Sequence, residues 1–210
     1  MKEKSVKFNF IMNMVLTMSN FIFPLITFPY VSRILLPIGT GKVAFATSIV
    51  TYFSMFAQLG IPTYGIRVCA QVRDDKKKLS RTVQELLGIS IWTTAAAYLL
   101  FFIGLWTVPR MRADKTLFLI VSTMILFNSI GMEWLYKGLE EYSYITIRSI
   151  MVKIISVGAM FLLVKSKEDY VIYGGISIFA SSASNVLNFM NAHKYVLLRP
   201  TGKYNFRQHM

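Results

Sequence analysis

Long stretches without charged residues divide this chain into six apolar segments. No Asp, Glu, Lys or Arg occurs in 8–32, 43–66, 86–109, 116–132 or 170–192. A sixth apolar segment, 144–164, carries only Arg148 and Lys153. A helix needs about 20 mostly apolar residues to cross a bilayer. The pattern therefore predicts six membrane-spanning helices, at 9–31, 43–66, 84–108, 116–136, 144–164 and 170–192.

The apolar segments favour helices over the strands of a membrane barrel. A barrel strand is about 10 residues long and alternates apolar with polar positions, whereas the run at 91–106 does not alternate. A helix also satisfies its own backbone hydrogen bonds within lipid. We therefore predict an all-α membrane protein whose residues 1–210 form a single six-helix bundle.

Composition agrees with a membrane protein and excludes several other classes. Hydrophobic residues make up 54% of the 210 residues and charged residues only 16%, against about 25% in soluble domains. Cys69 is the only cysteine, which excludes a disulfide scaffold. The net charge of +13 fits anionic lipid headgroups beside basic loops, and we expect no nucleic-acid partner.

The basic residues between the segments predict the orientation of the chain. If the segments cross alternately, 15 Lys and Arg residues lie at one end and 7 at the other. Basic loops favour the cytoplasmic side, so both termini are predicted there. The richer set is Lys2, Lys4, Lys7, Arg67, Arg73, Lys76, Lys77, Lys78, Arg81, Lys137, Arg148, Lys194, Arg199, Lys203 and Arg207. The other set is Arg33, Lys42, Arg110, Arg112, Lys115, Lys165 and Lys167.

Few charged groups fall at membrane depth, where they usually mark function. Glu133 and Lys137 are four residues apart and share one helix face, so they form either a salt-bridged helix end or a gating pair beside a cavity. Arg148 and Lys153 lie in the first half of the fifth segment. Lys153 either lines a cavity or extends its amine to the headgroups.

The ends and the interior of the first two segments hold further candidates. Arg33 and Arg67 lie at segment ends and either anchor the helices or offer guanidinium groups to phosphate. Pro24 and Pro29 each remove a backbone hydrogen bond inside the first segment, so both are candidate hinge positions. Proline is also common in membrane helices without such a role.

Catalytic and metal-binding patterns are weak. Asp74 and Asp75 form the only adjacent Asp pair and stand among basic residues, while His193 and His209 have no metal ligands at suitable spacing. No phosphate-binding G-x-x-x-x-G-K-[ST] motif occurs. We expect neither an enzyme nor a bound cofactor or metal.

Three stretches resemble a known family: FPYVSRILLPIGTGKVAFATSI (28–49), LGIPTYGIRVCAQVRDDKKKLSR (59–81) and GMEWLYKGLEEYSYITIRSI (131–150). They are similar to the N-terminal half of Wzx-type polysaccharide flippases, in the multidrug/oligosaccharidyl-lipid/polysaccharide (MOP) exporter superfamily with its MATE-like fold. The turn at 36–39 departs from the family's usual L-G-P-E-G.

The resemblance implies a transporter of the bacterial cytoplasmic (inner) membrane. Such flippases pair two six-helix lobes around a cationic cavity and carry polyprenyl-diphosphate-linked oligosaccharide, such as O-antigen units, for surface polysaccharide biosynthesis. The positions that match the family's motifs are Arg33, Arg67, Glu133, Trp134, Lys137 and Arg148. Lys153 is a further candidate for diphosphate binding, because a charge at membrane depth is costly and usually has a function.

Other roles remain open, because the chain is long enough for one lobe only. A homodimer or a C-terminal lobe absent from this chain would complete the transporter. Alternatively, the chain is a truncated, non-transporting membrane protein, or a partner of polysaccharide assembly proteins. A MATE-type drug exporter is disfavoured, since Glu85 and Glu133 are the only candidate ion-carrying acids and both lie near segment ends.

Overall fold

Helices dominate the computed structural model, which describes residues 5–197, and no strand occurs in that part of the chain. The α-helices are α1 (Val6–Gln58), α2 (Ile61–Gln71), α3 (Lys76–Thr107), α4 (Pro109–Ala113), α5 (Lys115–Ile130), α6 (Glu133–Gly138), α7 (Tyr142–Leu163) and α8 (Tyr170–Asn191). Two 3₁₀ turns, η1 (Lys167–Asp169) and η2 (Ala192–Lys194), flank α8. Lys2, Lys4, Arg199, Lys203, Arg207 and His209, which the sequence singled out, lie outside the described residues.

The chain is a multi-pass membrane protein by the length and composition of its helices. Five segments are long and apolar enough to cross a bilayer: Val6–Gln71, Lys76–Thr107, Lys115–Gly138, Tyr142–Leu163 and Lys167–Lys194. The first has 66 residues, so as one straight helix it would extend about 100 Å, roughly three times the hydrocarbon thickness. It does not run straight.

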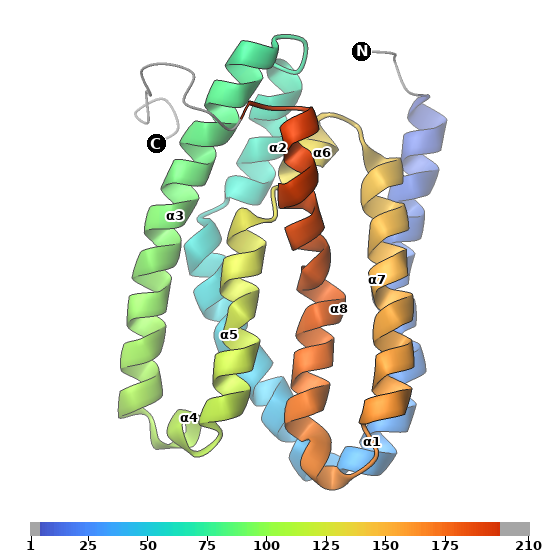
Figure 1. The fold of residues 1–210 in the computed structure, drawn as a ribbon, viewed down its shortest axis with the longest axis vertical. Coiled ribbons are helices and arrows are strands. Elements are labelled where there is room, and N and C mark those ends of the chain that lie inside the picture. Colours follow the sequence, from blue (N-terminus) through green and yellow to red (C-terminus); the bar gives the residue numbers. More distant parts are fainter. Residues whose placement is uncertain (1–4, 198–210) are drawn as a thin grey trace.

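Helix α1 folds back on itself at Leu36. This residue is not helical, with φ 57° and ψ 173°, and Pro37 follows it. Proline has no N–H and disfavours the helical conformation of the residue before it, so the helix direction changes there. Figure 1 shows the first limb of α1 (6–35) descending and the second limb (37–58) returning through the bundle to α2. The loop expected between 31 and 43 is thus a single non-helical residue.

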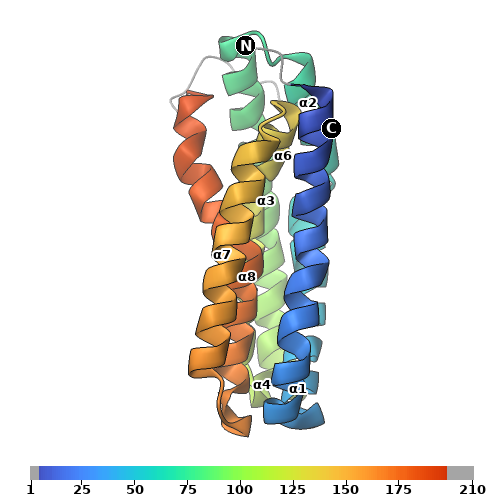
Figure 2. The same ribbon diagram turned by 90° about the vertical axis from the view of Figure 1, so that its right-hand side faces the viewer.

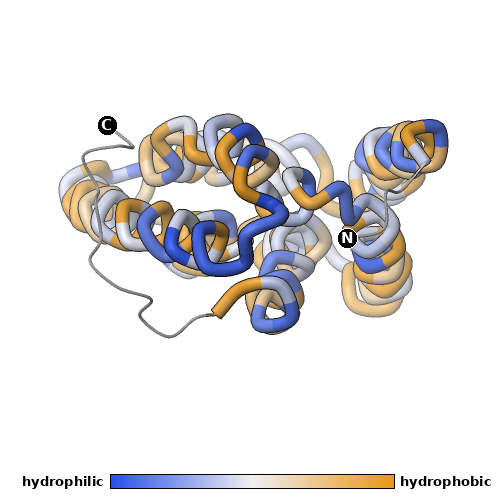
Figure 3. Tube along the Cα trace, turned by 90° about the horizontal axis from the view of Figure 1, so that it is seen from above, coloured by the Kyte–Doolittle hydropathy of each residue, from blue (hydrophilic) through white to orange (hydrophobic). Residues whose placement is uncertain are grey.

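The two limbs of α1 lie in different surroundings. The first limb runs beside α7 on one side of the bundle, as Figures 1 and 2 show. Seen along the bundle, this pair stands to one side, away from α3 (Figure 3). The second limb packs against α5 and α3 in the middle. Helix α8 contacts both α5 and α7 and so joins the two sides.

Two of the predicted helices are interrupted near the end of the bundle where α1 begins. The segment 43–66 breaks at Leu59 and Gly60, which have φ of 41° and 74°. The segment 116–136 breaks where Met132, with φ 43°, separates α5 from α6. Left-handed residues end a helix. The predictions of unbroken helices were therefore wrong at these two positions, and both breaks lie beside the short helices α2 and α6.

Helices α2 and α6 pack together through two glycines. A Cβ atom added to Gly65 would lie 2.8 Å from the Trp134 ring, and one added to Gly138 would lie 2.9 Å from the Cβ of Cys69. Cys69 and Trp134 are both buried in this contact. Small residues allow such close approach of helices. Any side chain larger than hydrogen at either glycine must push the helices apart.

Ion pairs hold the connections at both ends of the bundle. At one end, Arg73 after α2 pairs with Glu140 after α6, with 2.6 Å between Nη1 and Oε1. At the other end, Lys42 lies 2.8 Å from Asp114, which also accepts a hydrogen bond from the Tyr170 hydroxyl at 2.9 Å. These contacts fix the start of α5 and of α8 against the second limb of α1.

The close contact at Gly65 predicts that alanine destabilises the protein at this glycine but not at a glycine with open space around it. We expect Gly65→Ala to lower the free energy of unfolding by about 1–3 kcal/mol, because its Cβ overlaps the Trp134 ring. Gly158→Ala on α7 is the matched control, since no atom lies within 4 Å of its added Cβ and alanine favours a helix. Thermal unfolding of the purified protein measures both. Equal melting temperatures for the two variants would contradict the close packing of α2 on α6.

Candidate functional site

Arg148 is the most deeply buried of the predicted cationic residues. It lies on α7 with only 7% of its surface exposed. Its guanidinium carbon lies 5.5 Å from the centre of the Tyr144 ring, one helical turn earlier. Within the described residues, its Nε and Nη1 atoms have no hydrogen-bond partner. A buried charged donor without a partner is costly, so the position suits a guanidinium that receives an anion.

A series of contacts leads from this guanidinium through Tyr144 and Tyr136 to Asn188 on α8. The Tyr144 ring stacks on Tyr136 with centroids 5.1 Å apart. The Tyr136 hydroxyl donates a 2.6 Å hydrogen bond to the backbone oxygen of Asn188 on α8. The side-chain amide of Asn188 is buried, and its nitrogen and oxygen have no partner in the described part of the chain. Unsatisfied polar groups therefore occur on both α7 and α8.

Lys153 lies further along α7 and contacts the first limb of α1. Its Nζ donates hydrogen bonds of 2.6 Å to Ser19 Oγ and to Asn20 Oδ1. An ammonium group has three N–H donors, so one remains for another acceptor.

Glu133 and Lys137 form an ion pair on α6, with 2.7 Å between Oε1 and Nζ. Both line a cavity of about 240 Å³ together with Gln58, Asn128 and Asn185. Asn185 donates to Asn128, and Asn128 donates to Ser54, at 3.0 and 3.1 Å. This amide and hydroxyl network joins α8, α5 and the second limb of α1. The polar residues of the predicted last helix thus form hydrogen bonds to side chains of neighbouring helices.

The remaining predicted residues do not join this cluster. Arg33 and Arg67 are both exposed. Arg33 lies three residues before the reversal of α1, whereas Arg67 lies in α2 at the opposite end of the bundle. Pro24 and Pro29 lie inside the first limb, which continues as helix past both until Leu36. Of the four predicted cations, two therefore lie on α7, where Arg148 is buried and Lys153 half-buried, and two lie at separate ends of the bundle.

Sequence reasoning missed Asn188 as a site residue, together with the amides Gln58, Asn128 and Asn185. Each lies in an otherwise apolar segment, and asparagine and glutamine in membrane helices form hydrogen bonds between helices. An uncharged amide within an apolar run was therefore the available signal.

No three His, Cys, Asp or Glu side chains among residues 5–197 lie close enough together to hold a metal ion. The adjacent acids at 74–75 have a structural use instead. The Asp75 carboxylate caps α3 and accepts the backbone N–H groups of Lys78 and Lys77 at 3.1 and 3.0 Å. These hydrogen bonds hold the pKa of Asp75 below its usual value.

Charged groups inside a multi-pass helical membrane protein usually mark a substrate or ion pathway. Comparison with known families makes the assignment specific. Residues 6–210 match the model of the family described as "Polysaccharide biosynthesis protein", and the chain belongs to that family.

Two curated relatives are described as "Putative O-antigen transporter". The Escherichia coli (strain K12) protein is 25% identical over 183 residues, which cover 87% of this chain and 44% of the relative. The Shigella dysenteriae protein is 26% identical over 153 residues, which cover 73% and 38%. The chain thus spans less than half the length of these relatives. Both are described as transporters rather than enzymes, in keeping with the sequence prediction. No solved structure matches.

Proposed function

We propose that this chain forms one lobe of a flippase that moves polyprenyl-diphosphate-linked oligosaccharide across the bacterial cytoplasmic membrane. In this proposal the two limbs of α1 cross separately, which gives six crossings and places both termini in the cytoplasm. The basic residues of the α2–α3 connection favour that orientation. Family membership and the printed descriptions of the relatives support the substrate class.

The observation that carries the proposal is the buried Arg148, two of whose nitrogen atoms have no hydrogen-bond partner among residues 5–197. A diphosphate that leaves water loses hydration and needs charged donors in return. A guanidinium group offers paired N–H donors that match phosphate oxygens. Lys153 adds a third N–H donor on the same helix. Without an anion, these groups remain a net cost to the fold.

Arg33 and Arg67 act in this proposal at the two ends of the path rather than in its middle. Both are exposed at opposite ends of the bundle. Each can meet the diphosphate as the substrate enters from one leaflet or leaves to the other. Glu133 and Lys137 then serve as the gate, because their ion pair lines the cavity near the cytoplasmic end.

In this proposal a second lobe completes the substrate path. The second lobe comes either from further sequence or from a second copy of the chain, since two-fold dimers are the commonest oligomers. The alternative is a membrane protein that does not transport but binds proteins of polysaccharide assembly. The chain spans less than half the length of each curated relative.

A drug exporter driven by ions has less support. Such a protein needs acids at membrane depth that can take up protons or cations. Glu85 is buried, but Arg81 lies 3.0 Å from its carboxylate. Glu133 is paired with Lys137. Both acids thus have cationic partners already.

Replacement of the four cations tests the proposal in cells. We expect Arg148→Ala to lower surface polysaccharide at least tenfold, because a charge-assisted hydrogen bond contributes about 1.5–3 kcal/mol. Lys153→Ala is expected to have a smaller effect, and Arg33→Ala and Arg67→Ala the smallest, since both are exposed. The measurement is surface glycan in a strain whose only flippase contains this chain.

The control variant is Arg110→Ala, an exposed arginine on α4, for which no loss is expected. Wild-type glycan in all four cation variants would contradict the cationic path. Glycan synthesis that never depends on the chain at all would favour the non-transporting alternative.

The first limb of α1 is proposed to bend at Pro24 and Pro29 during transport. We expect the double variant Pro24→Ala/Pro29→Ala to restore two backbone hydrogen bonds and stiffen this limb. Surface glycan should then fall several-fold while the melting temperature rises or stays constant. Unchanged glycan in a folded double variant would exclude these prolines as hinges.

A further inference from the structure

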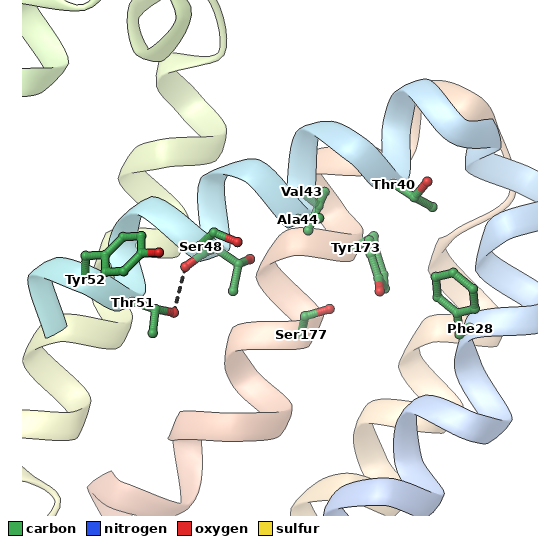
Figure 4. A pocket seen from close by; sticks show the side chains of 10 residues that line it. Phe28, Thr40, Val43, Ala44, Ser48, Thr51, Tyr52, Tyr173 and Ser177 are labelled. Carbon is green, nitrogen blue, oxygen red and sulfur yellow. Dashed lines mark hydrogen bonds between the residues drawn. The ribbon is translucent and has the colours of Figure 1, made fainter. Parts of the chain in front are cut away.

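A second pocket, larger than the cavity beside Glu133, lies between the two limbs of α1 and α8. Its volume is about 540 Å³, within the range of small-ligand sites. Figure 4 shows side chains from the first limb, the second limb and α8 around it. The lining residues are Phe28, Thr40, Val43, Ala44, Thr47, Ser48, Thr51, Tyr52, Tyr173 and Ser177.

Hydroxyl groups and aromatic rings characterise this pocket, and none of its lining residues is charged. Seven of the ten lining residues carry a hydroxyl group. Thr40 and Thr51 donate theirs to backbone oxygens of their own helix. In the described part of the chain, the hydroxyls of Ser48, Tyr173 and Ser177 have no hydrogen-bond partner. The pocket therefore presents both donors and acceptors without a net charge.

The pocket surface differs from the lipid-facing surface of the same protein. The exposed side of α3 carries large apolar residues such as Trp92, Leu99 and Trp106, each more than 60% exposed. At the pocket, by contrast, the exposed aromatic rings of Phe28 and Tyr52 alternate with the small side chains of Ala44 and Ser48. Hydrocarbon cannot satisfy hydroxyl groups. An occupant with hydrogen-bonding groups of its own fits this surface better than a lipid chain.

The pocket is also separate from the two cations of α7. Ser177 and Asn188 are 11 residues apart on α8, which corresponds to about 16 Å along the helix. Asn188 lies at the Tyr136 and Tyr144 stack beneath Arg148. The uncharged pocket thus lies toward the reversal of α1, while the cations lie toward the other end. One ligand that serves both regions has an anionic part and an uncharged part rich in hydroxyls.

We propose that the hydroxyl-lined pocket binds neutral sugar units of the transported oligosaccharide. Hydroxyls at the rim of a sugar ring can bond to Ser48, Tyr173 and Ser177, while its C–H faces can pack on Phe28 and Tyr52. This inference rests on the proposed function and adds a sugar subsite that is distinct from the diphosphate site.

Two lipid probes separate the sugar subsite from the diphosphate site. The protein, in lipid nanodiscs, is titrated with the lipid-linked oligosaccharide extracted from its host and with undecaprenyl diphosphate, which has no sugar. We expect the oligosaccharide-bearing lipid to bind about tenfold more tightly, as a few net hydrogen bonds predict.

The triple variant Ser48→Ala/Tyr173→Phe/Ser177→Ala removes the three hydroxyls with almost no change of volume. We expect it to lose the tenfold advantage and to bind undecaprenyl diphosphate as the wild type does. Ser32→Ala, a serine outside the pocket, is the control and should keep the advantage. A triple variant that keeps the advantage would overturn the sugar pocket and leave the proposed function standing. Failure of the wild type to bind either lipid would overturn the proposed function, and the sugar pocket with it.

Cysteine labelling gives a second readout that does not depend on the triple variant. Cys69 is the only native cysteine and is fully buried, so Ser48→Cys introduces an accessible thiol. We expect the oligosaccharide-bearing lipid, but not undecaprenyl diphosphate, to slow its maleimide labelling several-fold. Thr107→Cys, exposed at the end of α3, should label equally under all conditions. A Ser48→Cys thiol that stays inaccessible without ligand would identify the pocket as a protein interface and overturn the inference.

Discussion

Backbone hydrogen bonding in lipid is the constraint on which this structure depends. A membrane offers no partners to free N–H and C=O groups, so the chain stays helical wherever it can. Each interruption must therefore be local and compact. The reversal at Leu36 uses one non-helical residue before a proline, and the break at 59–60 uses two left-handed residues. These few positions determine which helix faces meet.

The reversal of α1 organises the surfaces that carry function. It places the first limb beside α7 and the second limb beside α5, and so leaves the hydroxyl-lined pocket between the limbs. Lys153 on α7 can then reach Ser19 and Asn20 of the first limb. Arg148 lies one to two turns away on the same helix. Charge and uncharged polarity are thus separated along the bundle, as the proposed substrate, with its charged diphosphate and its neutral sugars, requires.

The sequence alone predicted the helical class and the apolar segments, because hydropathy and charge vary strongly along the chain. It did not predict the breaks at Leu59 and Met132, since apolar residues in left-handed conformations leave no mark in hydropathy. Arg148 and Lys153 could be selected because a charged residue stands out in an apolar segment. Asn188 was missed because an uncharged amide in such a segment does not stand out.

The sequence could not predict how the site residues are placed relative to one another. Position along a span indicates depth, but not which neighbouring helix a side chain faces. Arg33 and Arg67 therefore looked equivalent to Arg148 as cavity cations, although both are exposed at opposite ends. The hydroxyl-lined pocket lies where both limbs of α1 meet α8, and the sequence does not show which faces of these helices meet.

The Nε and Nη1 groups of the buried Arg148, which have no hydrogen-bond partner among residues 5–197, are proposed to bind a phosphate group. The most direct measurement compares the binding of undecaprenyl diphosphate and of undecaprenol, which share the same hydrocarbon chain, to the wild type and to Arg148→Met. If the claim holds, the wild type binds the diphosphate at least tenfold more tightly than the alcohol, and Arg148→Met loses most of that preference. Equal affinity of the wild type for the two lipids, or an undiminished preference in Arg148→Met, would contradict it.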